Sequence, residues 1–309
     1  MATPVTEDVE QSIAKITPDT VGKLLFTSGS TGMPKAVINT QQMMCANAAM
    51  MMQVRPRDPN GPLSTYLDWM PWNHTMGGNA LFNPVLIEGG TLYIDDGRPM
   101  PGQLEETLQN LREVSPTYYA NVPAGYAALA AAMEKDDALC RSFFRNLGLM
   151  ARMAARGCRT ISTIACRRWP WRPPGERIVF YTGWGSTETA PTSTGTYWDT
   201  ERVGLIGAAV PRRRTEDGAG AGRNTKLRLR GVNVTPGYFG QPDLTEKVFD
   251  EEGYYCIGDA GVFVDRQRSR AGHHLRRPCG GGLQAHDRHL RACRLARTDA
   301  IAAATAGGA

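Results

Sequence analysis

A short run of glycines, hydroxyl side chains and one lysine stands near the start of the chain. It reads Thr27-Ser-Gly-Ser-Thr-Gly-Met-Pro-Lys35 and directly follows Leu24-Leu25-Phe26, which predicts a β-strand. Glycines let a backbone turn so that its N–H groups point at an anion, hydroxyls donate further hydrogen bonds, and a lysine adds positive charge. We therefore predict a phosphate-binding loop rather than a Ser/Thr/Gly-rich surface turn. It is not a Walker loop, because Met33 and Pro34 separate the last glycine from the lysine.

Three later segments carry further candidates. Tyr181-Thr-Gly-Trp-Gly-Ser-Thr-Glu188 ends in a hydroxyl and a carboxylate, which suits a ribonucleotide with a bound magnesium ion. Tyr255-Cys-Ile-Gly-Asp259 ends in a Gly-Asp pair, and Pro71 to Asn79 contains a histidine, His74. Each has a purely structural alternative: a helix-start acid and a core tryptophan in the first segment, a common turn in the second, and a hydrogen-bonded structural histidine in the third.

Taken in order, these segments resemble the adenylate-forming enzymes, a family of acyl-CoA synthetases, adenylation domains and luciferases. The loop matches the family signature T-S-G-[ST]-T-G-x-P-K completely. The segment from Tyr181 to Glu188 resembles the family's aromatic-G-x-T-E motif. The segment from Tyr255 to Asp259 resembles Y-x-T-G-D, from which Cys256 and Ile257 depart. The resemblance implies that the loop binds the β- and γ-phosphates of ATP while a substrate carboxylate attacks the α-phosphorus, and that pyrophosphate leaves.

The resemblance also implies a role for individual residues. Lys35 and Thr187 would be catalytic, acting on the departing pyrophosphate and on the α-phosphate, and His74 would shield or hydrogen-bond the substrate carboxylate. Glu188 would bind Mg²⁺. Nucleotide binding would fall to a larger set, with Trp184 beside adenine and Asp259 on the ribose hydroxyls: Thr27, Ser28, Gly29, Ser30, Thr31, Gly32, Trp184, Gly185, Thr187 and Asp259.

The stretch from Leu229 to Tyr238 resembles the family's R-G-x-x-V-x-x-G-Y pattern, for which we expect a structural role. The wording of Pro71 to Asn79, 183–194 and 231–245 resembles feruloyl-CoA-synthase-like ligases. That resemblance implies an aryl or hydroxycinnamic acid such as ferulate as substrate, with ATP, Mg²⁺ and CoA. An adenylation module that loads a carrier protein is the alternative within the fold, and acylation of free CoA would separate the two.

The alternation of short β-branched or aromatic runs with helical patterns predicts an α/β fold. We expect a partial large N-terminal domain of the adenylate-forming enzymes, with layered sheets and helices, over residues 1–204, and a small β subdomain over 205–265. Residues 266–309 are expected to form a disordered Arg-rich tail. The individual elements expected are strands at 91–94, 117–122, 178–181 and 226–230 and helices at 39–54 and 103–114, with an Ala-rich helix ending at Met133.

The net charge of +5 is concentrated in three patches that contain arginine but no lysine: 152–173, 211–224 and 266–309. The chain has 29 arginines and six lysines, a bias that GC-rich coding DNA produces. Because out-of-frame reading of such DNA yields Arg, Ala, Gly and Pro, we hypothesise that the three patches are frameshifted stretches. Translation of the coding DNA in its other two frames tests this. A nucleic-acid binder is the alternative from another class, but residues 266–309 lack the aromatic side chains that such a surface needs. A zinc site from Cys279, His286, His289 and Cys293 fits no common spacing.

The N-terminus has no signal-peptide pattern, there is no long apolar run, and the seven cysteines are scattered. We therefore expect a cytoplasmic protein with reduced thiols and neither a membrane nor a nucleic-acid partner. The family resemblance covers residues 20–150 and 175–265, and the family's long N-terminal stretch and its C-terminal domain with a catalytic lysine are not recognisable. We expect impaired acyl transfer and, from exposed core surface, aggregation on expression.

Overall fold

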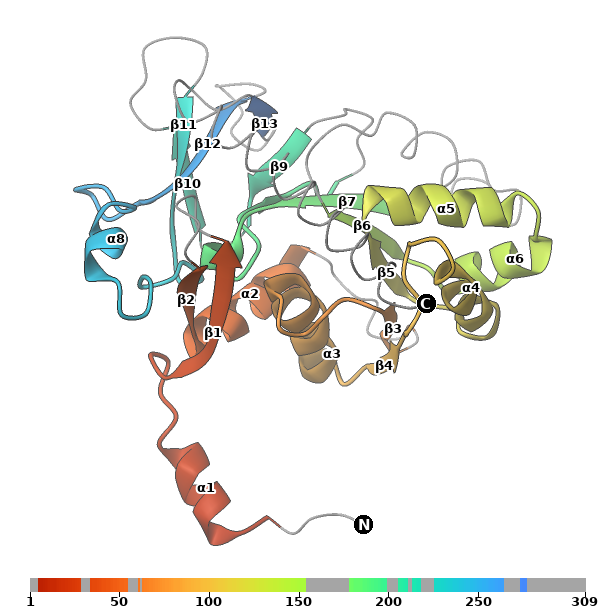
Figure 1. Cartoon of the computed structure of the whole chain (residues 1–309), viewed down its shortest axis with the longest axis horizontal. Helices are drawn as coiled ribbons and strands as arrows, with labels where there is room; N and C mark the ends of the chain where they lie inside the picture. The colour runs from red at the N-terminus through yellow and green to blue at the C-terminus, as the bar shows by residue number, and fades with distance from the viewer. Residues whose placement is uncertain are drawn as a thin grey trace, which may run out of the picture.

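The computed structural model describes residues 5–28, 34–54, 61, 63–153, 178–198, 205–210, 213–217, 225–263 and 273–276 (Figure 1). The helices are α1 (Glu7–Ala14), α2 (Gln41–Val54), the π-helix η1 (Met76–Phe82), α3 (Asn83–Glu88), α4 (Leu104–Glu113), α5 (Pro123–Met133), α6 (Asp137–Arg145), the 3-10 turn η2 (Thr187–Thr189) and α8 (Pro242–Glu246). The strands are β1 (Val21–Ser28), β2 (Pro34–Thr40), β3 (Thr65–Asp68), β4 (Thr91–Ile94), β5 (Tyr118–Asn121), β6 (Leu149–Met153), β7 (Val179–Trp184), β8 (Thr194–Gly195), β9 (Leu205–Ala209), β10 (Arg213–Asp217), β11 (Thr225–Gly231), β12 (Tyr255–Phe263) and β13 (His273–Arg276).

Most strands join one long mixed sheet in the order β10-β11-β12-β13-β9-β8-β7-β6-β5-β3-β4. The strands from β7 to β4 in this order are mutually parallel, and all other pairs are antiparallel. Parallel neighbours need crossover connections, and within the described chain helices α3, α4, α5 and α6 lie in the connections between β3 and β6. The α/β class predicted from the sequence is confirmed.

Apolar side chains cover both faces of the inner parallel strands β3, β5, β6 and β7, whereas the edge strand β4 is largely exposed. On β5, Tyr119 faces a cluster built with α4, α5 and α6, whereas Tyr118 and Ala120 face a second cluster built with α2, η1 and α3. The methionines Met43, Met44, Met50 and Met51 of α2 are buried and fill the core. Helices packed on both faces hold the parallel strands in place, and with them the ends of these strands.

The antiparallel strands carry a third apolar cluster. It contains Trp184 from the end of β7, Ile206 from β9, Leu227 and Leu229 from β11, and Tyr255 from β12. Trp184 therefore packs where the parallel part of the sheet meets the antiparallel part. In this cluster Trp184 of the 181–188 segment packs with Tyr255 of the 255–259 segment, so two of the segments singled out in the sequence lie together.

Most of the expected elements are present, but eight of the thirteen described strands were not individually predicted: β2, β3, β6, β8, β9, β10, β12 and β13. β2 was not predicted; it pairs antiparallel with β1 in a separate two-stranded sheet, so the first predicted strand lies outside the main sheet. β10 and β13 fall within Arg-rich patches in which no strand period was recognised. Their pairing comes from β11, β12 and β9, because a strand can be held by its neighbours' backbone groups whatever its own side-chain pattern. The rest of the 152–173 patch beyond Met153, and the four residues of the proposed zinc site, lie outside the described residues.

Helix α1 stands clear of the other elements (Figure 1), and every one of its residues is exposed. None of the helices described here has the length and apolar character required to cross a membrane. Cys45 and Cys256 of the described chain are free thiols, and Cys140 is buried.

Candidate functional site

The strand pair β1–β2 flanks the predicted phosphate loop. Thr27 and Lys35 are directly opposite each other in this ladder, and Ser28 is opposite Pro34. The Thr27 hydroxyl oxygen is buried and has no hydrogen-bond partner among the described residues. The hairpin therefore holds the loop by both ends and brings a hydroxyl and an ammonium group to its base.

Lys35 contacts two side chains from distant parts of the sequence. Its Nζ donates a hydrogen bond of 3.2 Å to the hydroxyl oxygen of Tyr238 and lies 3.9 Å from Glu188 Oε1. The same ammonium lies 4.6 Å from the centre of the Tyr238 ring, within the range of a cation–π contact. The Tyr238 hydroxyl donates in turn to Glu188 Oε1 at 2.9 Å. Three segments thus meet in one polar cluster.

Burial and charge act together on the tyrosines of this cluster. Tyr238 and Tyr255 both lie near the Glu188 carboxylate. Burial raises the pKa of each phenol, and the neighbouring Glu188 raises the pKa of each further. Both hydroxyls therefore remain protonated donors or acceptors across the physiological range.

Glu188 is 6% exposed and is held by the backbone around it. It lies in η2, whose preceding Gly185 approaches the Pro191 carbonyl oxygen so closely that a Cβ there would collide with it. Thr235 N donates to the Glu188 carbonyl oxygen at 2.8 Å, and the buried amide of Asn233 donates to the carbonyls of Thr189 and Thr192 at 2.7 and 2.8 Å. The turn is thereby fastened to the segment after β11.

The same segment is fastened to the hairpin. Ile38 N donates to the Gly237 carbonyl oxygen at 3.1 Å, and Phe239 N donates to the Ala36 carbonyl oxygen at 2.9 Å. The Thr235 hydroxyl donates to the Ile38 carbonyl oxygen at 2.7 Å. Tyr238 therefore reaches Lys35 and Glu188 from a backbone that is tied to both.

Asp259 of β12 contacts Trp184, the residue that ends β7 shortly before η2. The Trp184 indole Nε1 donates to Asp259 Oδ2 at 3.0 Å. Trp184 is 7% exposed and Asp259 is half-buried, so the bond is partly buried. Trp184 of the 181–188 segment and Asp259 of the 255–259 segment are therefore in direct contact.

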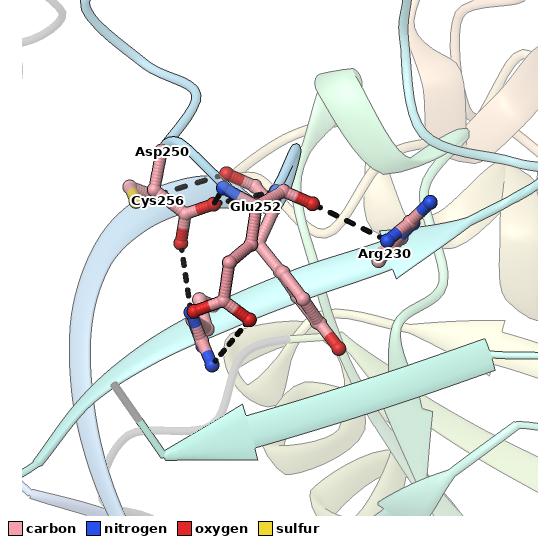
Figure 2. Close-up of polar contacts among 6 residues, drawn as sticks. Arg230, Asp250, Glu252 and Cys256 are labelled. Atoms are coloured by element: carbon pink, nitrogen blue, oxygen red, sulfur yellow. Dashed lines mark hydrogen bonds and ion pairs between the residues drawn. The ribbon is translucent and has the colours of Figure 1, made fainter. Parts of the chain in front are cut away.

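A charged cluster on the other side of β12 holds the turn that precedes it (Figure 2). The Arg228 guanidinium of β11 donates to Asp250 at 3.1 Å and to Glu252 at 2.8 Å, and lies 4.4 Å from the centre of the Tyr254 ring. Figure 2 also shows Arg230, whose guanidinium donates to the Glu252 carbonyl oxygen at 3.2 Å. These contacts fix where β12 begins, and with it the position of Tyr255.

Comparison with known proteins identifies the family. The AMP-binding enzyme family matches residues 2–239. The chain belongs to that family. The sulfoacetate–CoA ligase of Cupriavidus necator is 26% identical over 275 residues, which cover 84% of this chain and 48% of that ligase. The carboxylic acid reductase of Mycobacterium tuberculosis is 26% identical over 286 residues, covering 84% and 22%.

The fold of this AMP-binding enzyme also has a solved counterpart. The O-succinylbenzoate coenzyme A synthetase of Bacillus subtilis, solved in complex with AMP, superposes with a TM-score of 0.66 at 17% identity. The match covers 85% of this chain and 50% of that one. The expected partial N-terminal domain of the adenylate-forming enzymes is confirmed. The chain spans about half or less of the length of the relatives it matches.

The structure of the AMP-binding enzyme places the predicted site residues unequally. Lys35, Trp184, Glu188 and Asp259 are linked as described, with Gly185 and Thr187 in the turn between Trp184 and Glu188. Of the loop residues, Thr27 is described in full and Ser28 by its backbone alone, whereas Gly29, Ser30, Thr31 and Gly32 lie outside the described residues. Their predicted roles remain predictions.

His74 lies in an exposed turn before η1, where its Nδ1 accepts a hydrogen bond of 3.2 Å from the Met76 backbone N–H. This segment is tied to the hairpin through the buried Asn79, which accepts from Lys23 Nζ at 3.1 Å and donates to Asn39 at 2.8 Å. Burial lowers the pKa of Lys23. The role of His74 toward a substrate carboxylate remains a prediction.

The described residues contain no group of three or more His, Cys, Asp or Glu side chains that could hold a metal ion by themselves. A single carboxylate is nevertheless what a nucleotide-borne Mg²⁺ requires, because Mg²⁺ keeps several waters and takes most of its other oxygens from phosphates. Glu188 offers such a carboxylate; it accepts a hydrogen bond from Tyr238 and lies beside the Lys35 ammonium group. The residues present therefore fit the ion implied by the family resemblance.

Two residues of the site were not recognised from the sequence as functional. Tyr238 was expected to be structural, and Asn233 was not singled out. The Gly-Tyr pair at 237–238 was visible, but nothing in its local pattern shows that the tyrosine hydroxyl lies between Lys35 and Glu188.

Proposed function

We propose that this chain binds ATP and Mg²⁺ at the cluster around Lys35, Glu188 and Asp259, and that it is the nucleotide-binding part of an AMP-forming acid–thiol ligase. One observation carries the proposal: side-chain contacts link segments that are far apart in sequence. Lys35 on β2 contacts Glu188 and Tyr238, and Asp259 on β12 contacts Trp184 on the strand that leads to Glu188. These contacts support a single nucleotide site built from the hairpin, the turn and the Gly-Asp pair.

In the first half-reaction, a carboxylate oxygen of the acid forms a bond to the α-phosphorus of ATP. The bond from that phosphorus to the bridging oxygen breaks, so that acyl-adenylate and pyrophosphate result. Lys35 would stabilise the negative charge on the departing pyrophosphate, helped by the hydroxyls of Thr27, Ser28, Ser30 and Thr31. Thr187 would bind the α-phosphate, and Asp259 would accept hydrogen bonds from the ribose hydroxyls.

Glu188 would hold Mg²⁺, which when bound supplies positive charge to the phosphates. In the second half-reaction, the CoA thiol would attack the acyl carbonyl and release AMP. For the acid, we propose an aryl or hydroxycinnamic acid such as ferulate, on the wording around His74. A cytoplasmic location follows from the use of ATP and CoA, and we propose no nucleic-acid partner.

Loading of a carrier protein remains the second candidate for the thiol step. The chain is 26% identical both to a CoA ligase and to a carboxylic acid reductase. Because proteins of different activity share this part of the chain, the similarity supports carrier-protein loading as a second candidate. Both candidates make the same acyl-adenylate and differ only in the thiol acceptor.

Calorimetric titration of the full chain with ATP and Mg²⁺ tests the proposal first, followed by acid-dependent exchange of labelled pyrophosphate into ATP. We expect nucleotide binding and acid-dependent exchange in the wild type, and a weakening of both in Glu188→Gln. Mass spectrometry of free CoA incubated with ferulate then separates the two thiol acceptors. A wild-type chain that is folded and binds no nucleotide would overturn the proposal.

A further inference from the structure

The Trp184–Asp259 bond joins an aromatic residue to a carboxylate for which we proposed separate tasks. The indole ring lies in the third apolar cluster, against Ile206, Leu227 and Tyr255, and is 7% exposed. Its one polar atom is the indole N–H, which donates to Asp259 Oδ2 at 3.0 Å. Since a ring buried among apolar side chains has little freedom to rotate, the N–H is a fixed donor.

The backbone around Asp259 is built to turn that side chain out of the sheet. In the β11–β12 ladder, Lys226 pairs with Ala260 and Arg228 with Cys256, so Leu227 faces the three residues Ile257 to Asp259. Extra residues of this kind form a β-bulge, which re-aims side chains and is common beside active sites. Gly258 has φ +84, a left-handed conformation that a residue with a side chain rarely adopts.

A bulge by itself leaves a short carboxylate free to rotate about its own side-chain bonds. The indole N–H removes part of this freedom, because it holds Oδ2 from a rigid ring while Oδ1 carries the other acceptor positions of the group. A partly buried charge-assisted bond is also stronger than one in solvent. Asp259 is therefore preorganised in one orientation before any ligand arrives.

We infer that Trp184 is a positioning residue whose indole N–H orients Asp259 for recognition of the two ribose hydroxyls. This rests on the proposed nucleotide site and changes the role of Trp184 within it. A stacking aromatic would contribute to the base through its ring face, and phenylalanine could replace it. A positioning indole contributes to the sugar through its nitrogen, which phenylalanine lacks.

The test compares the dissociation constants of ATP and 2′,3′-dideoxy-ATP, which lacks both ribose hydroxyls, for the full chain and three variants. For the wild type we expect ATP to bind roughly tenfold or more tightly than the dideoxy nucleotide, the range for hydrogen bonds to a charged group. In Trp184→Phe the ratio falls to within about threefold, while the affinity for the dideoxy nucleotide changes little. Trp69→Phe is the matched control, because the buried Trp69 N–H has no hydrogen-bond partner among the described residues; its ratio stays at the wild-type value.

Asp259→Ala removes the acceptor of the same bond from the half-buried side, so it serves if Trp184→Phe fails to fold. Its nucleotide ratio should also fall, and one of the six tryptophan indole N–H resonances should shift relative to wild type. A folded Trp184→Phe that keeps the wild-type ratio, or an Asp259→Ala spectrum in which no indole signal moves, overturns the inference alone. Equal wild-type binding of both nucleotides overturns it together with the ribose role of Asp259, and leaves the phosphate site standing. Absence of all nucleotide binding overturns the proposed function itself.

Discussion

The Tyr238 hydroxyl donates to Glu188 Oε1 at 2.9 Å while it accepts from Lys35 Nζ at 3.2 Å. One hydroxyl thus satisfies a buried carboxylate and an ammonium group that lie 3.9 Å apart. A buried carboxylate is costly unless its oxygens are hydrogen-bonded. The bond from Tyr238 therefore gives the buried Glu188 carboxylate a hydrogen-bond donor at the place where a metal would be needed.

Tyr238→Phe should destabilise the fold by about 1–3 kcal/mol, the cost of leaving a buried acceptor without its donor. The ring that packs over Lys35 is kept, so the change isolates the hydroxyl. Urea unfolding measures the effect, and Tyr93→Phe, on the exposed edge strand β4, is the control that should stay near wild type. Equal stability of Tyr238→Phe and wild type would mean that the Glu188 carboxylate finds its donors elsewhere.

Lys35→Met should weaken ATP much more than AMP. The substitution keeps the aliphatic stem but removes the charge that we assign to the β- and γ-phosphates, which AMP lacks. We expect roughly a tenfold or larger loss for ATP and about threefold or less for AMP, in line with charge-assisted hydrogen bonds. Calorimetric titration of both nucleotides provides the measurement, with Lys226→Met as a control at an exposed lysine of β11. Parallel losses for the two nucleotides would place the lysine on the nucleoside instead.

The sequence singled out three motifs but not the residues that connect them. The three motifs carry their chemistry in adjacent residues, so the loop, the Trp184 to Glu188 turn and the Gly-Asp pair could be recognised locally. β2 was missed because its pattern begins with Pro34 and Lys35 and its strand character depends on pairing with β1 across the loop. The Tyr238 hydroxyl contacts Glu188, which is 50 residues away in sequence, and the Asn233 amide contacts Thr189, which is 44 residues away. A local sequence pattern does not predict such long-range contacts.

Asn233→Ala should be among the more damaging substitutions outside the charged cluster. The Asn233 side chain is fully buried, and its amide donates to two carbonyls, those of Thr189 and Thr192, in the chain after Glu188. Loss of both donors should cost about 2–4 kcal/mol, since each buried carbonyl left unpaired costs about 1–3 kcal/mol. Asn73→Ala, in the exposed turn beside His74, is the matched control. Urea midpoints that move equally in the two variants would contradict this account of the turn.

Asp68, at the end of β3, should make the stability of the fold depend on pH. Burial raises the pKa of Asp68 from 3.8 to about 7, opposed by the backbone N–H groups of Met70 and Trp69 and increased by Asp95. Its Oδ2 is buried without a hydrogen-bond partner among the described residues. The folded chain thus binds a proton at this carboxyl over a range in which the unfolded chain has released it.

The sign follows from that difference. Because the folded state holds more protons than the unfolded state between about pH 4 and pH 7, stability contributed by Asp68 is present at pH 4 and lost as the pH rises through 7. Asp68→Asn cannot ionise, so its stability relative to wild type should increase by about 4 kcal/mol from pH 4 to pH 8, at about 1.4 kcal/mol for each tenfold change in proton affinity. Urea unfolding across this range measures it, with the exposed neighbour Asp96→Asn as control. If Asp68→Asn and wild type followed parallel pH profiles, the carboxyl would titrate alike in both states and its burial would have no energetic consequence.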